Sequence, residues 1–153
     1  INSYTRMIKG FWAPTHSNWG VDNRTCAIRV IPGSPKSHRL EYRIAAADGN
    51  PYLALAAAVA CGLYGIEHKL ELPPMVEGNA YGLETSPDNV ELPNTLEKST
   101  NAFSKSKIMR KLFGGAWVDH FTITREWETK CYVEQKQSDP DWFWMRDRYF
   151  EII

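Results

Sequence analysis

The sequence predicts an α+β fold, in which antiparallel strands near the amino end are followed by helices. Two short segments, TCAIRVI (25–31) and HRLEYRI (38–44), have the β-branched or alternating pattern of strands, and only the six residues PGSPKS join them. A long apolar segment, 51–67, follows a helix start signal, and the periodic segments after it are helical.

Residues 1–24 are rich in Trp, Asn, Gly and Pro without a sustained period, which predicts a loop with short extended pieces. In the first strand Arg29 is the single charged side chain. In the second, Arg39, Glu41 and Arg43 alternate with apolar residues and therefore share one face. Two strands alone make a marginal sheet with an open edge, so we expect further strands from additional chain.

Asn50 and Pro51 give an N-cap and a first-turn proline for a helix over 51–67. This helix is apolar nearly all round, so we expect most of its surface to be covered. The proline-containing segment 71–93 has no clear period and predicts a long loop with a function or a contact to a neighbouring subunit.

Three further helices are predicted. Two of them are expected at about 94–113 and about 116–136, and the last at about 141–150, after a start signal at Asp139 and Pro140.

Composition excludes several classes. The chain has 153 residues, 43% of them hydrophobic, which suits one domain with a core, and it has no uninterrupted apolar stretch long enough to cross a bilayer. Cys26, Cys61 and Cys131 lie far apart without CxxC spacing, so neither a disulfide framework nor a zinc site is predicted. We expect a cytoplasmic protein without a membrane partner.

Charge is placed unevenly although the formal net charge is zero. Residues 1–43 carry seven basic and two acidic side chains, and five of the seven are arginines among apolar neighbours. Nucleic-acid binding favours many solvated lysines. The arginine pattern instead suits discrete anions, because a guanidinium fork matches carboxylate and phosphate geometry.

The two strands bring a carboxylate among arginines. One interpretation is an ion network in which Arg39 and Arg43 neutralise Glu41. The other is a functional site, where Glu41 binds a divalent cation and the guanidinium groups hold phosphate or a substrate carboxylate. Arg24 and Arg29 from the neighbouring strand favour the second interpretation, because four clustered like charges without an anion are costly.

Other common chemistries lack candidates. There is no GxxxxGK[ST] or GxGxxG turn, so a nucleotide would be held by side chains and metal. The four histidines have no ligand spacing, and no Ser, Cys or Thr occupies a nucleophile elbow.

Several motifs together resemble one family. These are NSYTR (2–6), GFWAPTHSNWGVDNRTCAIRVI (10–31), HRLEYRI (38–44), ADGNPYLALAAAVACGLYGIEHKLEL (47–72) and the closing aromatic helix. In this order, over nearly the whole chain, they resemble the C-terminal part of the catalytic domain of glutamine synthetases. The resemblance is closest to the bacterial type I group and its γ-glutamyl-amine ligase relatives.

The resemblance implies an ATP-dependent glutamate–ammonia ligase acting through γ-glutamyl phosphate. By this resemblance Glu41 is a ligand of Mg²⁺ or Mn²⁺, and Arg6 and Arg43 bind glutamate. Arg24 and Arg29 meet the transferred phosphoryl group as catalytic and ATP-binding residues, and Arg39 lies on the ATP side. Such roles agree with the physics of phosphoryl transfer, which depends on positioning and on neutralising charge.

The flap of the type I pattern reads GYEAP, whereas this chain has GFWAP, with Trp12 in place of the glutamate that helps bind and deprotonate ammonium. An indole cannot act as a base, although its face can hold a cation. Trp12 is therefore either an apolar lid residue or part of a site for another amine. The second alternative implies a γ-glutamylpolyamine or organic-amine ligase.

The family's remaining metal-ligating glutamates and its N-terminal domain are expected upstream of Ile1. We therefore interpret residues 1–153 as the C-terminal portion of the catalytic domain and expect this piece alone to be inactive. The family also implies a homo-oligomeric ring. Two other classes stay open, a non-catalytic structural homologue and a free-standing anion- or nucleotide-binding module.

Overall fold

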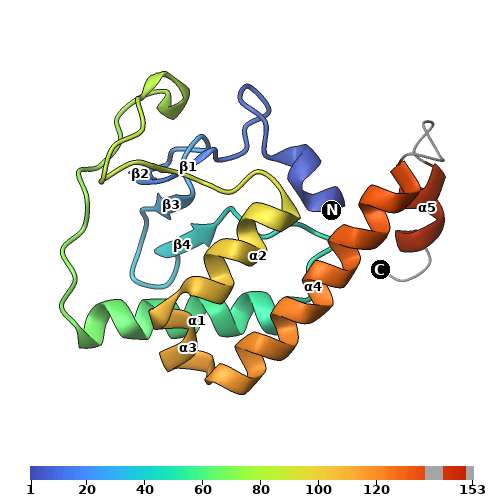
Figure 1. Cartoon of the computed structure of the whole chain (residues 1–153). Helices are drawn as coiled ribbons and strands as arrows, with labels where there is room; N and C mark the ends of the chain where they lie inside the picture. Colours follow the sequence, from blue (N-terminus) through green and yellow to red (C-terminus); the bar gives the residue numbers. More distant parts are fainter. Residues whose placement is uncertain (137–142, 151–153) are drawn as a thin grey trace. The chain divides into compact units, whose positions relative to one another are not determined.

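The computed structural model describes residues 1–136 and 143–150, and it has the α+β class that the sequence predicts (Figure 1). The chain divides into two units, Thr5–Leu92 and a second one made of Ile1–Tyr4 with the residues from Pro93 onward. The first unit holds the strands and a long helix, and the second is helical. The short helix η1 (Asn2–Arg6) spans the boundary between the two units. The first unit then contains β1 (His16–Ser17), β2 (Trp19–Val21), β3 (Ile28–Ile31), β4 (Arg39–Tyr42), α1 (Pro51–Glu67), η2 (Ala80–Gly82) and β5 (Val90–Glu91).

The main sheet has three strands in the order β2-β3-β4. The predicted antiparallel pair is confirmed, and its register places Arg29 opposite Glu41. The third strand comes from the segment expected to be a loop with extended pieces, and β2 runs parallel to β3. Gly20 in β2 is required, since a Cβ there would stand 2.8 Å from the carbonyl oxygen of Val76.

A second, two-stranded sheet pairs β1 with β5. It ties the end of the long 71–93 segment to the amino-terminal part of the unit. Beside it, the buried Asn18 donates from its Nδ2 to Asn89 Oδ1 at 2.8 Å. The segment predicted to lack regular structure therefore contains η2 and β5 and is anchored at its end.

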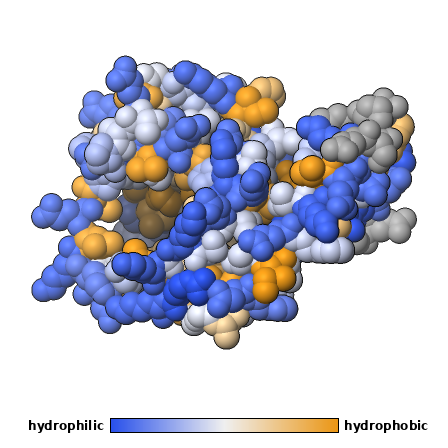
Figure 2. Space-filling view, viewed as in Figure 1, coloured by the Kyte–Doolittle hydropathy of each residue, from blue (hydrophilic) through white to orange (hydrophobic). Residues whose placement is uncertain are grey.

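Helix α1 has the predicted bounds, and Asn50 caps it by accepting hydrogen bonds from the backbone N–H groups of Tyr52 and Leu53. The expectation that this apolar helix is covered is not met, because no α1 residue is buried by the part of the chain that the structure describes. Leu63 and Ile66 are 62% and 77% exposed. Apolar residues are exposed at several places on the face seen in Figure 2.

The second unit contains α2 (Leu96–Lys105), α3 (Lys107–Phe113), α4 (Gly115–Lys136) and α5 (Phe143–Tyr149). The segment predicted to be helical at 94–113 is helical, but it is divided in two, because Ser106 adopts an extended backbone, ends α2 and caps α3 by accepting from the N–H of Met109. Helix α4 matches the prediction for 116–136. The predicted start signal at Asp139 and Pro140 lies outside the described residues.

Aromatic rings fill the interior of this second unit. Trp117 and Phe121 stack on α4 with ring centroids 5.1 Å apart, and Phe103 from α2 meets Phe121 edge to face. Val118 is fully buried beside them. Within the described ranges, no helix is long and apolar enough to span a membrane.

Glu128 on α4 joins α5 through Arg148, which donates from Nε and Nη2 at 2.7 and 2.6 Å, and through the Tyr149 hydroxyl. The hydrogen bond from Arg148 lowers the pKa of Glu128 below its ordinary value of 4.5. A lowered pKa stabilises the folded chain above about pH 4.5, and this stabilisation is lost as the pH falls through the folded value.

We expect Glu128→Gln to lower the free energy of unfolding by about 1 kcal/mol at pH 7, since Arg148 is partly solvated, and by less toward pH 3. Chemical denaturation at both pH values measures this. The exposed Glu126, two residues before Glu128 on α4, provides the control Glu126→Gln. Equal effects of the Glu128 change at both pH values would contradict the assignment.

Candidate functional site

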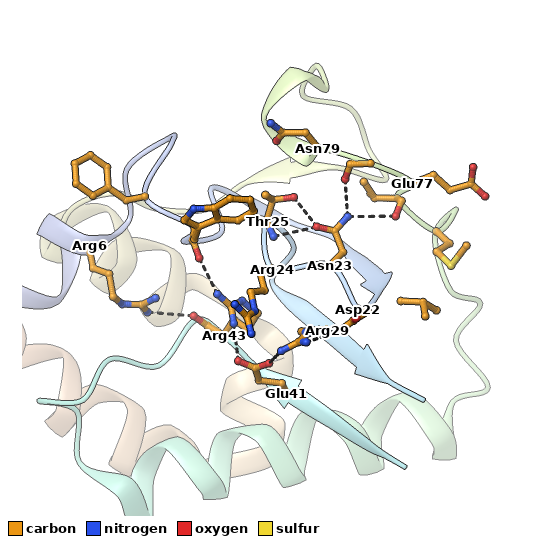
Figure 3. A pocket seen from close by; sticks show the side chains of 16 residues that line it. Arg6, Asp22, Asn23, Arg24, Thr25, Arg29, Glu41, Arg43, Glu77 and Asn79 are labelled. Carbon is orange, nitrogen blue, oxygen red and sulfur yellow. Dashed lines mark hydrogen bonds and ion pairs between the residues drawn. The ribbon is translucent and has the colours of Figure 1, made fainter. Parts of the chain in front are cut away.

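A cavity of about 1040 Å³ opens on the sheet-containing unit, and all its lining residues belong to Thr5–Leu92 (Figure 3). Five parts of the chain form its walls. They are Arg6, the Phe11–Trp12 turn, the end of β2 with the connection to β3, the facing side chains on or beside β3 and β4, and the loop residues 75–79.

The centre of the cavity is a carboxylate held by two arginines. Arg29 Nη1 donates to Glu41 Oε2 at 2.9 Å, and Arg43 Nη1 donates to Glu41 Oε1 at 2.5 Å. The Arg29 hydrogen bond is the main cause that lowers the pKa of Glu41, and the Arg43 charge adds to it. Glu41 is therefore ionised at neutral pH. Its side chain keeps 36% of its surface exposed, so the carboxylate remains accessible to a ligand.

Arg43 and Arg6 also bind backbone carbonyl groups. Arg43 Nη2 donates to the Trp12 carbonyl at 2.7 Å, and Arg6 Nη2 donates to the carbonyl of Ile44 at 2.8 Å. In both residues Nε is buried without a hydrogen-bond partner among the described atoms. Buried donors are rarely left unsatisfied, so these two Nε–H groups are exceptions within the described residues.

The two remaining arginines differ in position. Arg24 lines the cavity, and within the described chain no hydrogen bond engages its guanidinium group. Arg39 shares a sheet face with Glu41 by register, but it is not among the cavity-lining residues. Its Nη1 donates to the Ser37 carbonyl at 3.0 Å. The structure thus brings together five of the six charged residues singled out from sequence, and Arg39 lies outside this group.

Trp12 lies at the rim of the cavity beside Phe11, and their side chains are 65% and 70% exposed. The Trp12 backbone has a φ of +55°, a left-handed conformation that bulky residues rarely adopt. The turn is fixed by hydrogen bonds to two of its carbonyls, since Arg43 binds that of Trp12 and the Tyr81 hydroxyl binds that of Ala13 at 3.0 Å. Two exposed aromatic rings therefore stand beside a charged floor.

Sequence reasoning did not single out Asp22 and Asn23, which follow β2. Asp22 Oδ1 accepts from Arg29 Nε at 3.0 Å and also from Arg29 Nη2. The signal for them in the sequence is their place directly before Arg24 in the segment GFWAPTHSNWGVDNRTCAIRVI, which carries the family resemblance.

Asn23 holds the loop wall in place. Its Nδ2 donates to the Gly78 carbonyl at 2.7 Å, and its Oδ1 accepts from the N–H and the hydroxyl of Thr25. The Thr25 hydroxyl in turn accepts from the N–H of Ala80 at 2.9 Å. Residues far apart in sequence are thus joined by side-chain hydrogen bonds.

The donor set fits a divalent cation in part. The carboxylate oxygens of Glu41 are hard ligands with lone pairs beyond those used by the arginines. Within the described residues, however, no group of three or more His, Cys, Asp or Glu side chains could hold a metal ion. Such an ion would need further ligands from substrate phosphates, water or additional chain.

A cavity with an ionised acid and several guanidinium groups is of the class whose chemistry suits small anions held by side chains. Comparison with known proteins identifies the family. Residues 1–144 match the model described as glutamine synthetase, catalytic domain. The chain belongs to the glutamine synthetase family.

Three relatives illustrate its range. The chain is 45% identical to type-1 glutamine synthetase 2 of Dictyostelium discoideum over 155 residues, covering 100% of this chain and 28% of that protein. It is 40% identical to a glutamate–isopropylamine ligase of Pseudomonas sp, covering 100% of this chain and 32% of that protein. It is 46% identical to a γ-glutamylethanolamide synthetase of Streptomyces coelicolor over 121 residues, covering 79% and 25%. The chain spans about a third or less of the length of these relatives.

We expect Asn23→Ala to free the loop wall. Amide exchange of Val76 and Ala80 should become about tenfold faster, because the hydrogen bonds lost are worth roughly 1 to 2 kcal/mol of local stability. Hydrogen exchange followed by mass spectrometry measures this. Asn50→Ala removes a cap elsewhere in the same unit and should leave the exchange of these two residues unchanged. Unaltered exchange in the Asn23 variant would contradict the proposed tie.

Proposed function

We propose that this chain forms part of an ATP-dependent glutamate–amine ligase. The observation that carries the proposal is the carboxylate of Glu41 fixed between Arg29 and Arg43 on the floor of a cavity that Arg6 and Arg24 also line. The family membership supports the same reaction class.

In this reaction an oxygen of the γ-carboxylate of glutamate attacks the γ-phosphorus of ATP, and ADP leaves. The amine nitrogen then attacks the carbonyl carbon of γ-glutamyl phosphate, phosphate leaves with the bonding electrons, and the nitrogen loses a proton. Both steps move negative charge between oxygens, so they depend on cations placed in advance.

Each site residue has a proposed part in these steps. Arg6 and Arg43 bind glutamate, and their place in the cavity lining supports this. Arg24 and Arg29 neutralise the transferred phosphoryl group, and Arg39 is proposed for the ATP side. Glu41 would hold Mg²⁺ or Mn²⁺, which supplies charge neutralisation at the phosphates when bound.

We further propose that residues 1–153 are the C-terminal portion of a larger catalytic domain, in an oligomeric ring in the cytoplasm. Three observations support this. The chain spans 28% and 32% of the first two relatives compared, Glu41 offers too few ligands for the metal among the described residues, and no residue of the apolar α1 is buried by that part of the chain. A non-catalytic structural homologue is disfavoured, because it gains nothing from keeping these costly clustered charges.

Ammonia is the first candidate for the amine, on the family resemblance. An organic amine is the second, and Trp12 is the observation that favours it. Its indole and the Phe11 ring offer apolar surface and a cation-binding face at the cavity rim. Relatives named for isopropylamine, ethanolamine and putrescine products or substrates show that members of the family differ in the amine.

Replacing Glu41 by Ala in the intact enzyme should lower kcat for ADP release, with glutamate and an amine present, by about 100-fold or more. The reason is that the site loses the carboxylate proposed to hold the divalent cation. Glu67→Ala, at the exposed end of α1, serves as the control and should stay within about twofold of the parent rate. Unchanged turnover in the Glu41 variant would contradict the ligand assignment.

The 153-residue chain alone should show no ligase turnover. Calorimetry of this chain with Mg²⁺ and ATP distinguishes this proposal from a free-standing nucleotide-binding module. Binding of ATP by the isolated chain would support the module.

The amine is tested by turnover of the intact enzyme with ammonium, ethylamine and putrescine. If Trp12 contacts an organic amine, Trp12→Glu should lower kcat/KM for ethylamine or putrescine by about tenfold and raise it for ammonium. Trp127→Ala changes an exposed aromatic residue outside the cavity and should alter neither. Turnover of the parent enzyme with ammonium alone would remove the organic-amine candidate.

A further inference from the structure

Asp22 is a strained residue at the mouth of the cavity. It follows β2 directly and has a φ of +50°, a left-handed conformation that is uncommon for non-glycine residues and that Asp adopts more readily than most. Its backbone N–H donates to the Val30 carbonyl at 2.8 Å, and this bond fixes the chain at the end of the strand. The conformation places the Asp22 carboxylate beside the side chain of Arg29 (Figure 3).

Arg29 is held from two sides. Nε and Nη2 donate to one oxygen of Asp22, and Nη1 donates to Glu41 at 2.9 Å. A guanidinium group has five N–H donors in one plane, so two remain for a ligand. The Arg29 side chain is only 16% exposed, whereas that of Asp22 is 66% exposed. The plane of the guanidinium group is therefore fixed by two carboxylates, that of Glu41 on β4 and that of Asp22 directly after β2.

This arrangement matters because arginine has a long side chain with several rotatable bonds. Fixing it before the ligand arrives removes an entropy cost from the reaction and keeps the charge where it is needed. Asp22 also offsets the repulsion among the clustered guanidinium groups, since Arg24 and Arg43 line the same cavity. Asp22 does not belong to any group of three or more potential metal ligands in the described chain.

We infer that Asp22 is a positioning residue for phosphoryl transfer: its carboxylate orients the Arg29 guanidinium group so that the free N–H donors meet the transferred phosphoryl group. This rests on the proposed function. Asp22 acts through Arg29 and does not touch the substrate itself.

The test uses the intact enzyme and measures kcat, and KM for ATP and glutamate, by ADP release. Asp22→Ala should lower kcat by about tenfold or more, because small misplacements of catalytic groups cost up to about 100-fold. KM for glutamate should stay within about twofold. Asp22→Asn keeps an oxygen acceptor and should recover part of the lost rate. Asp88→Asn, an exposed acid outside this cavity, is the matched control and should leave kcat unchanged.

A double-mutant cycle separates positioning from a general structural effect. In an Arg29→Ala background, Asp22→Ala should lower kcat no further, because the residue through which it acts is gone. Additive losses would overturn the inference, as would a kcat within twofold of the parent in the Asp22→Ala single variant. If Asp22→Ala does not fold, Asp22→Asn carries the cycle, with the same expected non-additivity. An inactive parent enzyme would instead contradict the proposed function.

Discussion

The site depends on one contact, the ion pair between Arg29 and Glu41 across β3 and β4. The two residues lie directly opposite each other in the pairing of β3 and β4. The backbone hydrogen bonds of the sheet therefore set the distance between their side chains. Glu41 also accepts a hydrogen bond from Arg43, and Arg29 also donates two hydrogen bonds to Asp22. A partly buried environment strengthens these contacts relative to water. A shift of one residue in the pairing would turn the side chains of the shifted strand to the opposite face and so separate Arg29 from Glu41.

The cavity has a second side, a wall formed by loop residues 75–79. One backbone hydrogen bond, from the Val76 N–H to the Trp19 carbonyl, ties this loop to β2. Amide and hydroxyl side chains hold it further through the Gly78 carbonyl and the Ala80 N–H. The buried side chains of Asn18 and Asn89 bond to each other and fix the far end of the same segment. Strand pairing thus fixes the charged floor, and side-chain hydrogen bonds together with one contact to the sheet edge fix the facing wall.

Sequence reasoning succeeded where local chemistry decides the structure. The cap at Asn50 and the apolar run after it gave the bounds of α1, and alternation along β4 placed Glu41 and Arg43 on one face. It failed where a single side chain chose between two local structures, as Ser106 did in dividing the helix predicted at 94–113. Residues such as Asp22 and Asn23 were missed because their partners come from other elements, and no periodicity encodes that. Arg39 shows the converse, since a shared face did not bring it to the cavity.

Gly20 allows the loop to lie against β2. Its missing side chain lets β2 approach Val76 closely enough for the backbone of the facing loop to bond to the strand, through the Val76 N–H and the Trp19 carbonyl at 2.9 Å. Even the methyl group of alanine would stand 2.8 Å from the Val76 carbonyl oxygen and would press these two backbones apart. The wall that faces the arginines thus stays close to the sheet because of a residue that is not itself among those lining the cavity.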